Sequence, residues 1–444
     1  MSNHGSSQPL PPPSLATRLL HADDPDHVKL PNHPVAPIIS LSTTFRSPHP
    51  DSNEARLLRG STESDMDQPS IDMQNPTFHV YSRYTQDTSG RCEKVLSTLL
   101  NGHALTYSSG LNSAYAALTH YSPSVIAIRR GYHGCHESIK LFARGRDVKI
   151  IDLDDDYPQL PSGHGGLLVW AETPLNPTGE ARDIKKYTEK AHAVGGKVLV
   201  DATFAPPPLQ DPFVQGADIV MHSGTKYFGG HSDLLCGVLA VKDKKEWDSL
   251  WHDRTFLGSN LGGLEAYLLL RSLRTLKVRV RQQSETATKL ASWLHSLSTT
   301  GTPSGATDEP ESVIKGRFIG RTWHASLQPR ADKDEEANGL VEGEDFDPRQ
   351  QMPGGWSPTF AFRTSKPEYA RILPHMVTYF TPATSLGGVE SLLEHRIMSD
   401  PKDDPRLIRI SVGLEEFEDL RADLLSAFSK ILDLESKGEL KPWV

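Results

Sequence analysis

Short apolar segments alternate with segments of helical spacing through most of the first half of the chain. The apolar segments have the length and composition of buried strands, and they lie at 104–107, 124–128, 147–151, 166–171, 197–200 and 218–221. Helices are expected before the first of them, at 93–100, and between others, at 111–121 and 184–193. Short buried strands connected by helices are typical of right-handed crossover units and a mostly parallel sheet. The sequence therefore predicts an α/β fold, in which ligands lie beyond the carboxyl ends of the strands.

Polar groups follow the predicted strands at these carboxyl ends. They are Ser109-Gly110, Glu172, Asp201 and Ser223. The loop from Ser108 to Leu111 leads from a strand into a helix, so free backbone N–H groups at the helix start can hold an anion. A serine that only caps the helix explains the same residues equally well.

Two charged residues at these ends point to one cofactor. Asp201 ends a strand that should be buried on both faces, where a carboxylate needs a positive or proton-bearing partner. The protonated ring nitrogen of pyridoxal 5'-phosphate would be such a partner. Lys226 lies beside the hydroxyls of Ser223 and Thr225, which could bond a phosphate. Burial would lower the pKa of the lysine amine so that it can attack a carbonyl. Alone, this turn could carry a surface lysine; with Asp201 and the helix start it predicts a pyridoxal phosphate site.

Other kinds of site are disfavoured. The net charge of −9 and the lack of a basic block argue against nucleic-acid binding, and no apolar run of about 18 residues is present to span a membrane. Three scattered cysteines (Cys92, Cys135 and Cys236) suit a reducing compartment, so a cytoplasmic location is expected. The spacing of His133, Cys135 and His136 is not a standard zinc pattern, and no metal is expected; pocket lining or a reactive thiol stay open for these residues. The order Gly-Thr-Lys also differs from the Gly-Lys-Ser/Thr of a nucleotide-binding P-loop.

The chain is predicted to have three parts. Residues 1–75 would be a polar tail, an extended arm and a polar insertion that begins near residue 46. Residues 76–295 would form the large cofactor-binding α/β domain, and one long helical segment at 264–297 would link it to the last part. Residues 296–444 would form a smaller α+β domain with a polar insertion at about 299–354, strands at 359–362 and 407–412, and helices at 366–377 and 417–434.

Seven motifs follow one another along the chain. They are Tyr81-Ser-Arg83, Ser108-Ser-Gly-Leu111, Glu172-Thr-Pro-Leu-Asn-Pro177, Val200-Asp-Ala-Thr-Phe-Ala205, His222-Ser-Gly-Thr-Lys-Tyr227 with Gly229-Gly-His-Ser-Asp233, Thr384-Ser-Leu-Gly-Gly-Val-Glu-Ser391, and Leu407-Ile-Arg-Ile-Ser-Val-Gly413. In this order they resemble the Cys/Met-metabolism pyridoxal phosphate enzymes, the cystathionine γ-synthase and γ-lyase family of fold type I. The resemblance runs from about Ala16 to the C-terminus, interrupted by the two polar insertions.

The resemblance implies a role for four residues in the chemistry. Lys226 would form a Schiff base with the cofactor and then move protons along the substrate carbons. Asp201 would pair with the pyridine nitrogen, and Asn176 would lie near the phenolic oxygen of the cofactor. Tyr132 would stack on the cofactor ring and help to move protons.

The resemblance also implies which residues bind the phosphate and the substrate. The phosphate would be held by Gly110, Leu111, Ser223 and Thr225. Tyr81 and Arg83 would reach the phosphate of a neighbouring subunit, which implies a dimer with shared active sites and, in this family, usually a homotetramer. Arg409 would clamp the substrate α-carboxylate, with Ser385 beside it.

Three departures from the family pattern border the expected substrate pocket. Gln86-Asp87-Thr88 replaces a common Asn-Pro-Thr, His133-Gly134-Cys135 replaces a usual Gly-Gly-Thr, and Arg396 follows His395 where the family usually has proline. They leave the predicted cofactor site intact and leave the substrate and reaction open.

The first expectation for function is a cystathionine γ-synthase-like γ-replacement, in which a thiol such as L-cysteine replaces the acyloxy group at Cγ of an O-acyl-L-homoserine. Two alternatives within the family stay open: β- or γ-elimination from cystathionine, methionine or cysteine, and γ-substitution by a non-sulfur nucleophile. A catalytically idle binding homologue is disfavoured, because Lys226, Asp201 and Arg409 are all retained.

Overall fold

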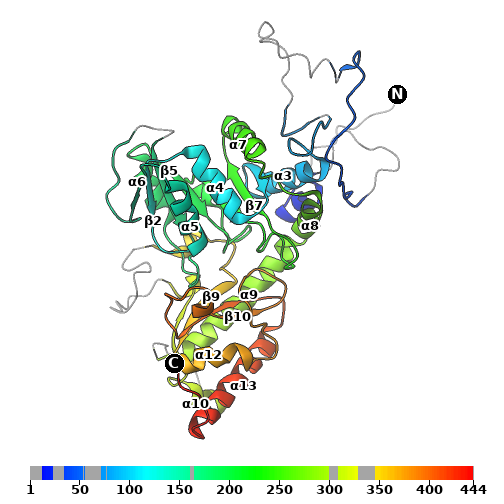
Figure 1. Ribbon diagram of the computed structural model, residues 1–444. Coiled ribbons are helices and arrows are strands. Elements are labelled where there is room, and N and C mark those ends of the chain that lie inside the picture. Colours follow the sequence, from blue (N-terminus) through cyan, green and yellow to red (C-terminus); the bar gives the residue numbers. More distant parts are fainter. Residues whose placement is uncertain are drawn as a thin grey trace, which may run out of the picture.

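The computed structural model describes residues 13–23, 35–53, 55, 72–76, 78–160, 165–299, 309–328 and 346–443. Most of the predicted insertion that begins near residue 46, and the acidic part of the predicted insertion at 299–354, lie outside these residues. Figure 1 shows a large sheet surrounded by helices and, below it, a small sheet with the C-terminal helices. Helix α9 (Leu276–Ser296) runs from the first group to the second.

The large sheet has seven strands in the order β1-β7-β6-β5-β4-β2-β3. Their bounds are β1 His103–Tyr107, β2 Val125–Ile128, β3 Lys149–Ile151, β4 Leu167–Glu172, β5 Lys197–Asp201, β6 Ile219–Ser223 and β7 Gly237–Val241. Among these described strands only β7 is antiparallel to its neighbours, which confirms the mostly parallel sheet. The six predicted strands are β1 to β6, and β7 is an additional strand.

Helices cover both faces of the large sheet. Their bounds are α3 Asp87–Leu99, α4 Gly110–Tyr121, α5 His133–Ala143, α6 Ile184–His192, α7 Lys244–Leu257 and α8 Gly263–Leu273. Because side chains alternate along a strand, Trp170 packs with α4, α5 and α7 on one face while its neighbour Val169 packs with α6 on the other. Strands covered on both faces must be apolar throughout, which is why β2 and β4 could be predicted.

Two helices of this layer had not been predicted, α5 and α7. Helix α7 is rich in charged residues on most of its surface, and of its 14 residues only Trp247, Leu250, Arg254 and Thr255 are buried. Such a helix lacks a wide apolar stripe, so helical spacing is a weak signal for it. The contact of Trp247 with the backbone carbonyl of Ala104, at 3.0 Å, is a tertiary one that local sequence does not reveal.

The small sheet is antiparallel, with the order β10-β11-β9-β8. Its bounds are β8 Ile319–Trp323, β9 Thr359–Thr364, β10 Leu392–His395 and β11 Leu407–Ser411. Helices α10 (Glu309–Ile314), α12 (Pro367–Ile372) and α13 (Phe417–Ser436) lie beside it. Phe428 of α13 stacks on Phe318 with ring centroids 4.3 Å apart, which anchors the last helix in the apolar core. This part confirms the small α+β unit expected after the large sheet.

Two predictions on this half of the chain were wrong. The segment 264–297 is not one helix, because α8 ends at Leu273 and α9 begins at Leu276. At this break the chain makes a turn, in which the carbonyl of Ser272 accepts hydrogen bonds from the Thr275 N–H and from the Arg279 guanidinium. The segment 299–354 is not polar insertion throughout either, since β8 lies within it and pairs with β9.

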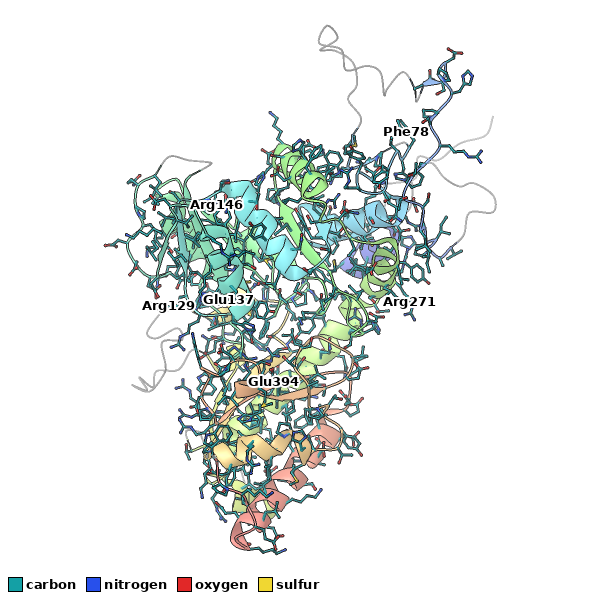
Figure 2. All side chains as sticks on the ribbon, in the orientation of Figure 1. Phe78, Arg129, Glu137, Arg146, Arg271 and Glu394 are labelled. Carbon is teal, nitrogen blue, oxygen red and sulfur yellow. The ribbon has the colours of Figure 1, made fainter. Side chains whose placement is uncertain are left out.

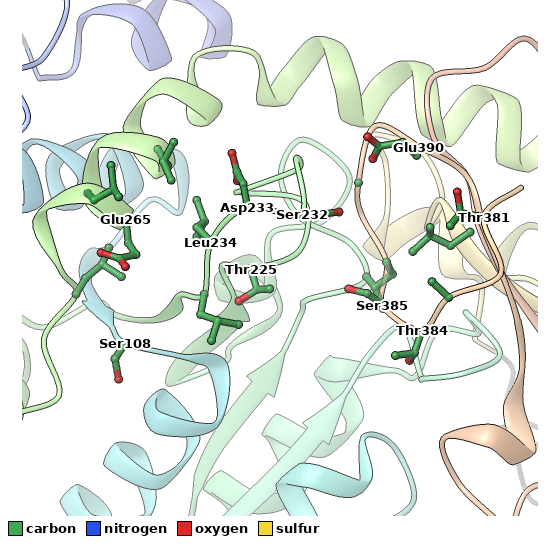
Figure 3. A pocket seen from close by; sticks show the side chains of 18 of the residues that line it. Ser108, Thr225, Ser232, Asp233, Leu234, Glu265, Thr381, Thr384, Ser385 and Glu390 are labelled. Carbon is green, nitrogen blue, oxygen red and sulfur yellow. The ribbon is translucent and has the colours of Figure 1, made fainter. Parts of the chain in front are cut away.

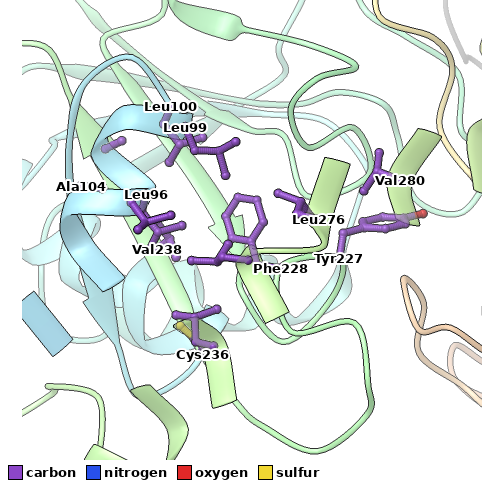
Figure 4. Close-up of a cluster of buried hydrophobic side chains, with 14 of the residues drawn as sticks. Leu96, Leu99, Leu100, Ala104, Tyr227, Phe228, Cys236, Val238, Leu276 and Val280 are labelled. Atoms are coloured by element: carbon purple, nitrogen blue, oxygen red, sulfur yellow. The ribbon is translucent and has the colours of Figure 1, made fainter. Parts of the chain in front are cut away.

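An apolar cluster supports the turn that carries Lys226 (Figure 4). Phe228 lies in this cluster between leucines of α3 and of α9, and its side chain is buried. Tyr227 is buried too, and its hydroxyl meets the Thr359 hydroxyl of β9 at 2.7 Å. The two residues that follow the predicted lysine turn are therefore held in the apolar cluster, and Tyr227 also bonds the small sheet. No helix in the described part of the chain is long and apolar enough to cross a membrane.

Candidate active site

A cavity of about 520 Å³ opens at the carboxyl ends of the parallel strands. The polar residues predicted at those ends, Ser109, Glu172, Asp201 and Ser223, all line it. The small sheet closes the opposite side with Arg409 of β11 and with Ser385 and Arg396. Ten of the twelve predicted site residues line this one cavity: Gly110, Leu111, Tyr132, Asn176, Asp201, Ser223, Thr225, Lys226, Ser385 and Arg409.

The amine of Lys226 lies at the boundary between the two sheets. It follows β6 by three residues, and its Nζ donates a hydrogen bond to Ser385 Oγ at 2.9 Å. Burial and the neighbouring Arg409 guanidinium lower the pKa of this amine to about 8, against the opposing effect of Glu394. A lowered pKa gives the lysine a neutral, nucleophilic form near neutral pH.

The pH dependence of cofactor capture should reveal this lowered pKa. With a pKa of about 8, roughly half of the Lys226 amine is neutral at pH 8, whereas an ordinary lysine amine would be neutral in about 0.4% of molecules. We expect the rate at which cofactor-free protein captures pyridoxal 5'-phosphate to rise with pH and to be half-maximal near pH 8. Stopped-flow absorbance measures this rate, and a rate that keeps rising toward pH 10 would contradict the assignment.

Asp201 is held by Thr203, which the sequence had not singled out as a site residue. Asp201 Oδ1 accepts hydrogen bonds from the N–H of Thr203 at 3.1 Å and from its hydroxyl at 2.6 Å. The same Thr203 hydroxyl accepts from the Ser223 N–H at 2.8 Å, so it joins the ends of β5 and β6. Asp201 Oδ2 has no hydrogen-bond partner among the residues described, so it is available to a ligand in the cavity.

The surroundings of Asp201 fit a protonated pyridine ring. Its carboxylate is 5% exposed, and burial raises its pKa because no cation of the described chain pairs with it. A proton-bearing ring nitrogen at Oδ2 would remove that cost and strengthen the ring as an electron sink. The donor set therefore fits pyridoxal phosphate on structural grounds.

Glu172 supports the opposite wall of the cavity. Its carboxylate accepts backbone N–H groups of Tyr132 at 2.7 Å and of Asn176 at 2.8 Å. Gly131 precedes this contact with φ of 90°, and a Cβ there would lie 2.4 Å from Glu172 Oε2, so only glycine fits. Burial and the charge of Asp201 raise the pKa of Glu172. Tyr132, thus fixed at the start of α5, keeps 38% of its surface exposed toward the cavity.

The helix start at Ser109 combines the two roles that the sequence left open. Ser109 caps α4, since its Oγ accepts from the Asn112 N–H at 3.1 Å. The N–H groups of Gly110 and Leu111 come first in the helix and have no intrahelical acceptor. A Cβ on Gly110 would lie 2.9 Å from Ser223 Oγ, so the glycine lets the helix start approach the turn after β6. The cradle between them is suited to a phosphate.

Arg409 is the buried cation of the small sheet. Its Nη1 donates to Asn176 Oδ1 at 2.9 Å, and its Nη2 donates to the Ser385 carbonyl at 3.0 Å and contacts Glu394 at 2.5 Å. Burial lowers the pKa of the guanidinium to about 10, which still leaves it charged at neutral pH. Ser385 has φ of 109°, a conformation rare for residues other than glycine, and it bonds Lys226 and Arg409 at once.

Tyr81 and Arg83 do not line this cavity. Arg83 lies over the rings of Tyr81 and Tyr84, and its Nη1 donates to the Thr255 carbonyl at 3.3 Å. The single chain therefore does not bring these two predicted residues to its own Lys226.

A second cavity of about 970 Å³ adjoins the first (Figure 3). The two share Thr225, Leu235 and the segment 384–386. Figure 3 shows Thr225 facing Ser385 across it, with Asp233 on one rim and Glu390 on the other. The second cavity is also lined by Leu264, Glu265 and Leu268 of α8, whereas Lys226 lines only the first.

Comparisons with known proteins agree with this geometry. The family described as Cys/Met metabolism PLP-dependent enzyme matches residues 17–300 and 338–429. The chain is 31% identical to a cystathionine gamma-lyase of Saccharomyces cerevisiae over 94% of this chain and 97% of the relative. It is 31% identical to a cystathionine gamma-synthase of Mycobacterium bovis over 78% and 85% of the two chains. The crystal structure of cystathionine gamma-lyase from yeast is similar with a TM-score of 0.72 and 27% identity, over 95% of this chain and 99% of that chain.

Proposed function

The chain belongs to the Cys/Met metabolism PLP-dependent enzyme family, and we propose that it catalyses γ-replacement on an O-acyl-L-homoserine with a thiol such as L-cysteine. Family membership makes it a pyridoxal 5'-phosphate-dependent enzyme of sulfur amino-acid metabolism. One observation carries the proposal: the Lys226 amine, the Asp201 carboxylate and the Arg409 guanidinium line one cavity.

Pyridoxal 5'-phosphate, when bound, supplies the electron sink that stabilises negative charge on the carbons next to the substrate amino group. Gly110, Leu111, Ser223 and Thr225 would hold its phosphate, Asp201 would keep its ring nitrogen protonated, and Tyr132 would lie against its ring. Asn176 Oδ1 accepts a hydrogen bond from Arg409 Nη1, so its amide NH₂ is the group that would be left for the phenolic oxygen.

Arg409 would bind the α-carboxylate of the substrate and so place Cα and Cβ within reach of Lys226. The Lys226 amine, with its pKa near 8, would take up and return protons at these two carbons at neutral pH. Ser385 would accept an N–H of the lysine in its resting position, and Tyr132 would move a second proton.

Room for an incoming thiol supports replacement. The cavity continues past Lys226 and Arg409 to Arg396 and Ser399, and it adjoins the second cavity at Thr384. A nucleophile can therefore approach from the side opposite to the cofactor-binding sheet.

Elimination is the second candidate, and the 31% identity to a cystathionine gamma-lyase over 94% of the chain favours it. The same residues would then move the same protons, but no nucleophile would add after the leaving group departs, and water would hydrolyse the released unsaturated amino product to a ketoacid and ammonia. γ-Substitution by a non-sulfur nucleophile uses the same groups as well. The catalytically idle alternative has no support from the site, because its lysine, aspartate and arginine converge on one cavity.

We further propose that Tyr81 and Arg83 complete the phosphate site of a neighbouring subunit in a homo-oligomer, a dimer or tetramer, in the cytoplasm. The support is that they lie away from this chain's own cavity, next to the described residues of the N-terminal arm: Thr44 bridges Tyr81. The test is the Arg83→Ala variant, which should bind the cofactor more weakly than wild type. Sedimentation should show that the variant still forms the homo-oligomer.

A product analysis separates replacement from elimination. We expect the protein loaded with pyridoxal phosphate to form cystathionine from O-acetyl- or O-succinyl-L-homoserine only when L-cysteine is present, as measured by mass spectrometry. Ketoacid and ammonia from cystathionine, with no cystathionine formed from either ester, would overturn replacement in favour of elimination.

A further inference from the structure

A second buried arginine, Arg396, lies in the wall of the active-site cavity. It begins the short helix η4 (Arg396–Met398) directly after β10, is 5% exposed, and lines the cavity together with Ser399. Neither side chain has a part in the function proposed above. The arginine stands where the sequence departs from the proline usual in the family.

The guanidinium of Arg396 is only partly satisfied. Its Nε donates to Asp403 at 3.0 Å, and its Nη1 is 3.3 and 3.4 Å from the two oxygens of Glu394, long for a charge-assisted hydrogen bond. No acceptor for Nη2 exists among the residues that the structure describes. This nitrogen is not among the fully buried side-chain atoms that lack a partner, so its N–H groups are open to water or to an acceptor that enters the cavity.

Arg396 and Arg409 flank one carboxylate. Glu394 and Arg409 are direct neighbours across β10 and β11, and Glu394 Oε2 is 2.5 Å from Arg409 Nη2 and 3.3 Å from Arg396 Nη1. The Ser399 hydroxyl donates to the other Glu394 oxygen. Figure 2 labels Glu394 at the end of the small sheet that faces the large one. The guanidinium groups of Arg396 and Arg409 therefore lie on the same side of the cavity, with the Glu394 carboxylate between them.

We propose that Arg396 is a second carboxylate-binding position, which selects substrates bearing an acidic group beyond the α-carboxylate held by Arg409. The inference rests on the proposed use of O-acyl-L-homoserines and names the preferred member: an ester of a dicarboxylic acid, such as O-succinyl-L-homoserine, over the neutral O-acetyl ester.

The test compares release of succinate and of acetate from the two esters by the protein loaded with pyridoxal phosphate. Both replacement and elimination release the acid, so the readout does not depend on which reaction occurs. We expect wild type to prefer the succinyl ester, and Arg396→Gln to lower kcat/KM for that ester about 10- to 100-fold while the acetyl ester changes less than about threefold. Arg406→Gln is the matched control: it removes the same charge from the same segment, pairs with Asp404 at 2.8 Å, and is not among the residues lining the cavity.

An equal loss on both esters would show that Arg396 only maintains the fold, and it would overturn the inference. If neither ester is consumed, the proposed function is wrong. The role proposed for Arg396 is then tested separately by measuring ligand binding. Calorimetry with L-2-aminoadipate and L-norleucine compares a distal carboxylate with a methyl group on chains of equal length. We expect tighter binding of aminoadipate to wild type, and loss of that difference in Arg396→Gln; equal affinities in wild type would overturn the inference.

Discussion

Replacing Lys226 by alanine should lower kcat about 10³- to 10⁴-fold, because the variant lacks the amine proposed to transfer protons at the substrate carbons. The side-chain amine of Lys226 lines the cavity and has a pKa lowered to about 8. Steady-state kinetics on the productive substrate measure the loss. Borohydride should fix the cofactor on a peptide that contains Lys226 in wild type and should fix none there in the variant.

Lys242→Ala is the matched control for this substitution. Lys242 follows β7, is exposed, and donates to the Asn101 carbonyl at 2.7 Å. Its removal should leave kcat within about twofold, as for most surface substitutions. A Lys226→Ala protein that kept a tenth of wild-type activity would refute the assignment of the proton-transfer amine.

Arg409→Gln should lower kcat/KM about 10²- to 10³-fold, because a substrate α-carboxylate would lose its charged partner in a buried site. Most of the loss should be in KM if the guanidinium binds ground state and transition state equally. The affinity for pyridoxal phosphate should change little, since the groups proposed to hold it belong to the large sheet. Absorbance titration of the cofactor-free protein measures that affinity beside the kinetics.

Arg409→Lys separates charge from geometry. Lysine keeps the positive charge but cannot bond Asn176 and Ser385 as a planar fork does, so an intermediate loss is expected. If lysine restored full kcat/KM, bidentate binding of the carboxylate by Arg409 would be wrong. Thermal unfolding of each variant checks that Glu394, left with a weaker partner, has not destabilised the fold.

The cofactor-binding half of the site could be predicted from sequence because it depends on strand ends. Asp201 and Ser223 end parallel strands, and parallel strands present their carboxyl ends at the same edge. A carboxylate buried at such a strand end needs a positive or proton-bearing partner, which limits the ligands that can lie opposite it. Thr203 was not predicted as a site residue, although it follows Asp201 by two residues, because its bond to the Ser223 N–H exists only once β5 and β6 are neighbours.

The substrate half was harder to predict because it depends on contacts distant in sequence. Arg409 was assigned from the family resemblance, whereas Glu394 is brought beside it by the pairing of β10 with β11, and β10 had not been predicted. The break between α8 and α9 has the same origin: Arg279 bonds the carbonyl of Ser272 and, 52 residues away in sequence, that of Tyr227. Short or polar segments such as β10 and α7 carry little periodicity of their own.

The hydrogen bond between Asn176 and Arg409 spans 233 residues and joins the two sheets. The groups proposed to run the chemistry belong to the large sheet, and those proposed to choose the substrate belong to the small one. Selectivity can therefore diverge through substitutions in the segment 384–409 while the cofactor-facing strands stay unchanged. A chimera that exchanges only this segment with a relative should keep the cofactor and acquire the substrate preference of the donor.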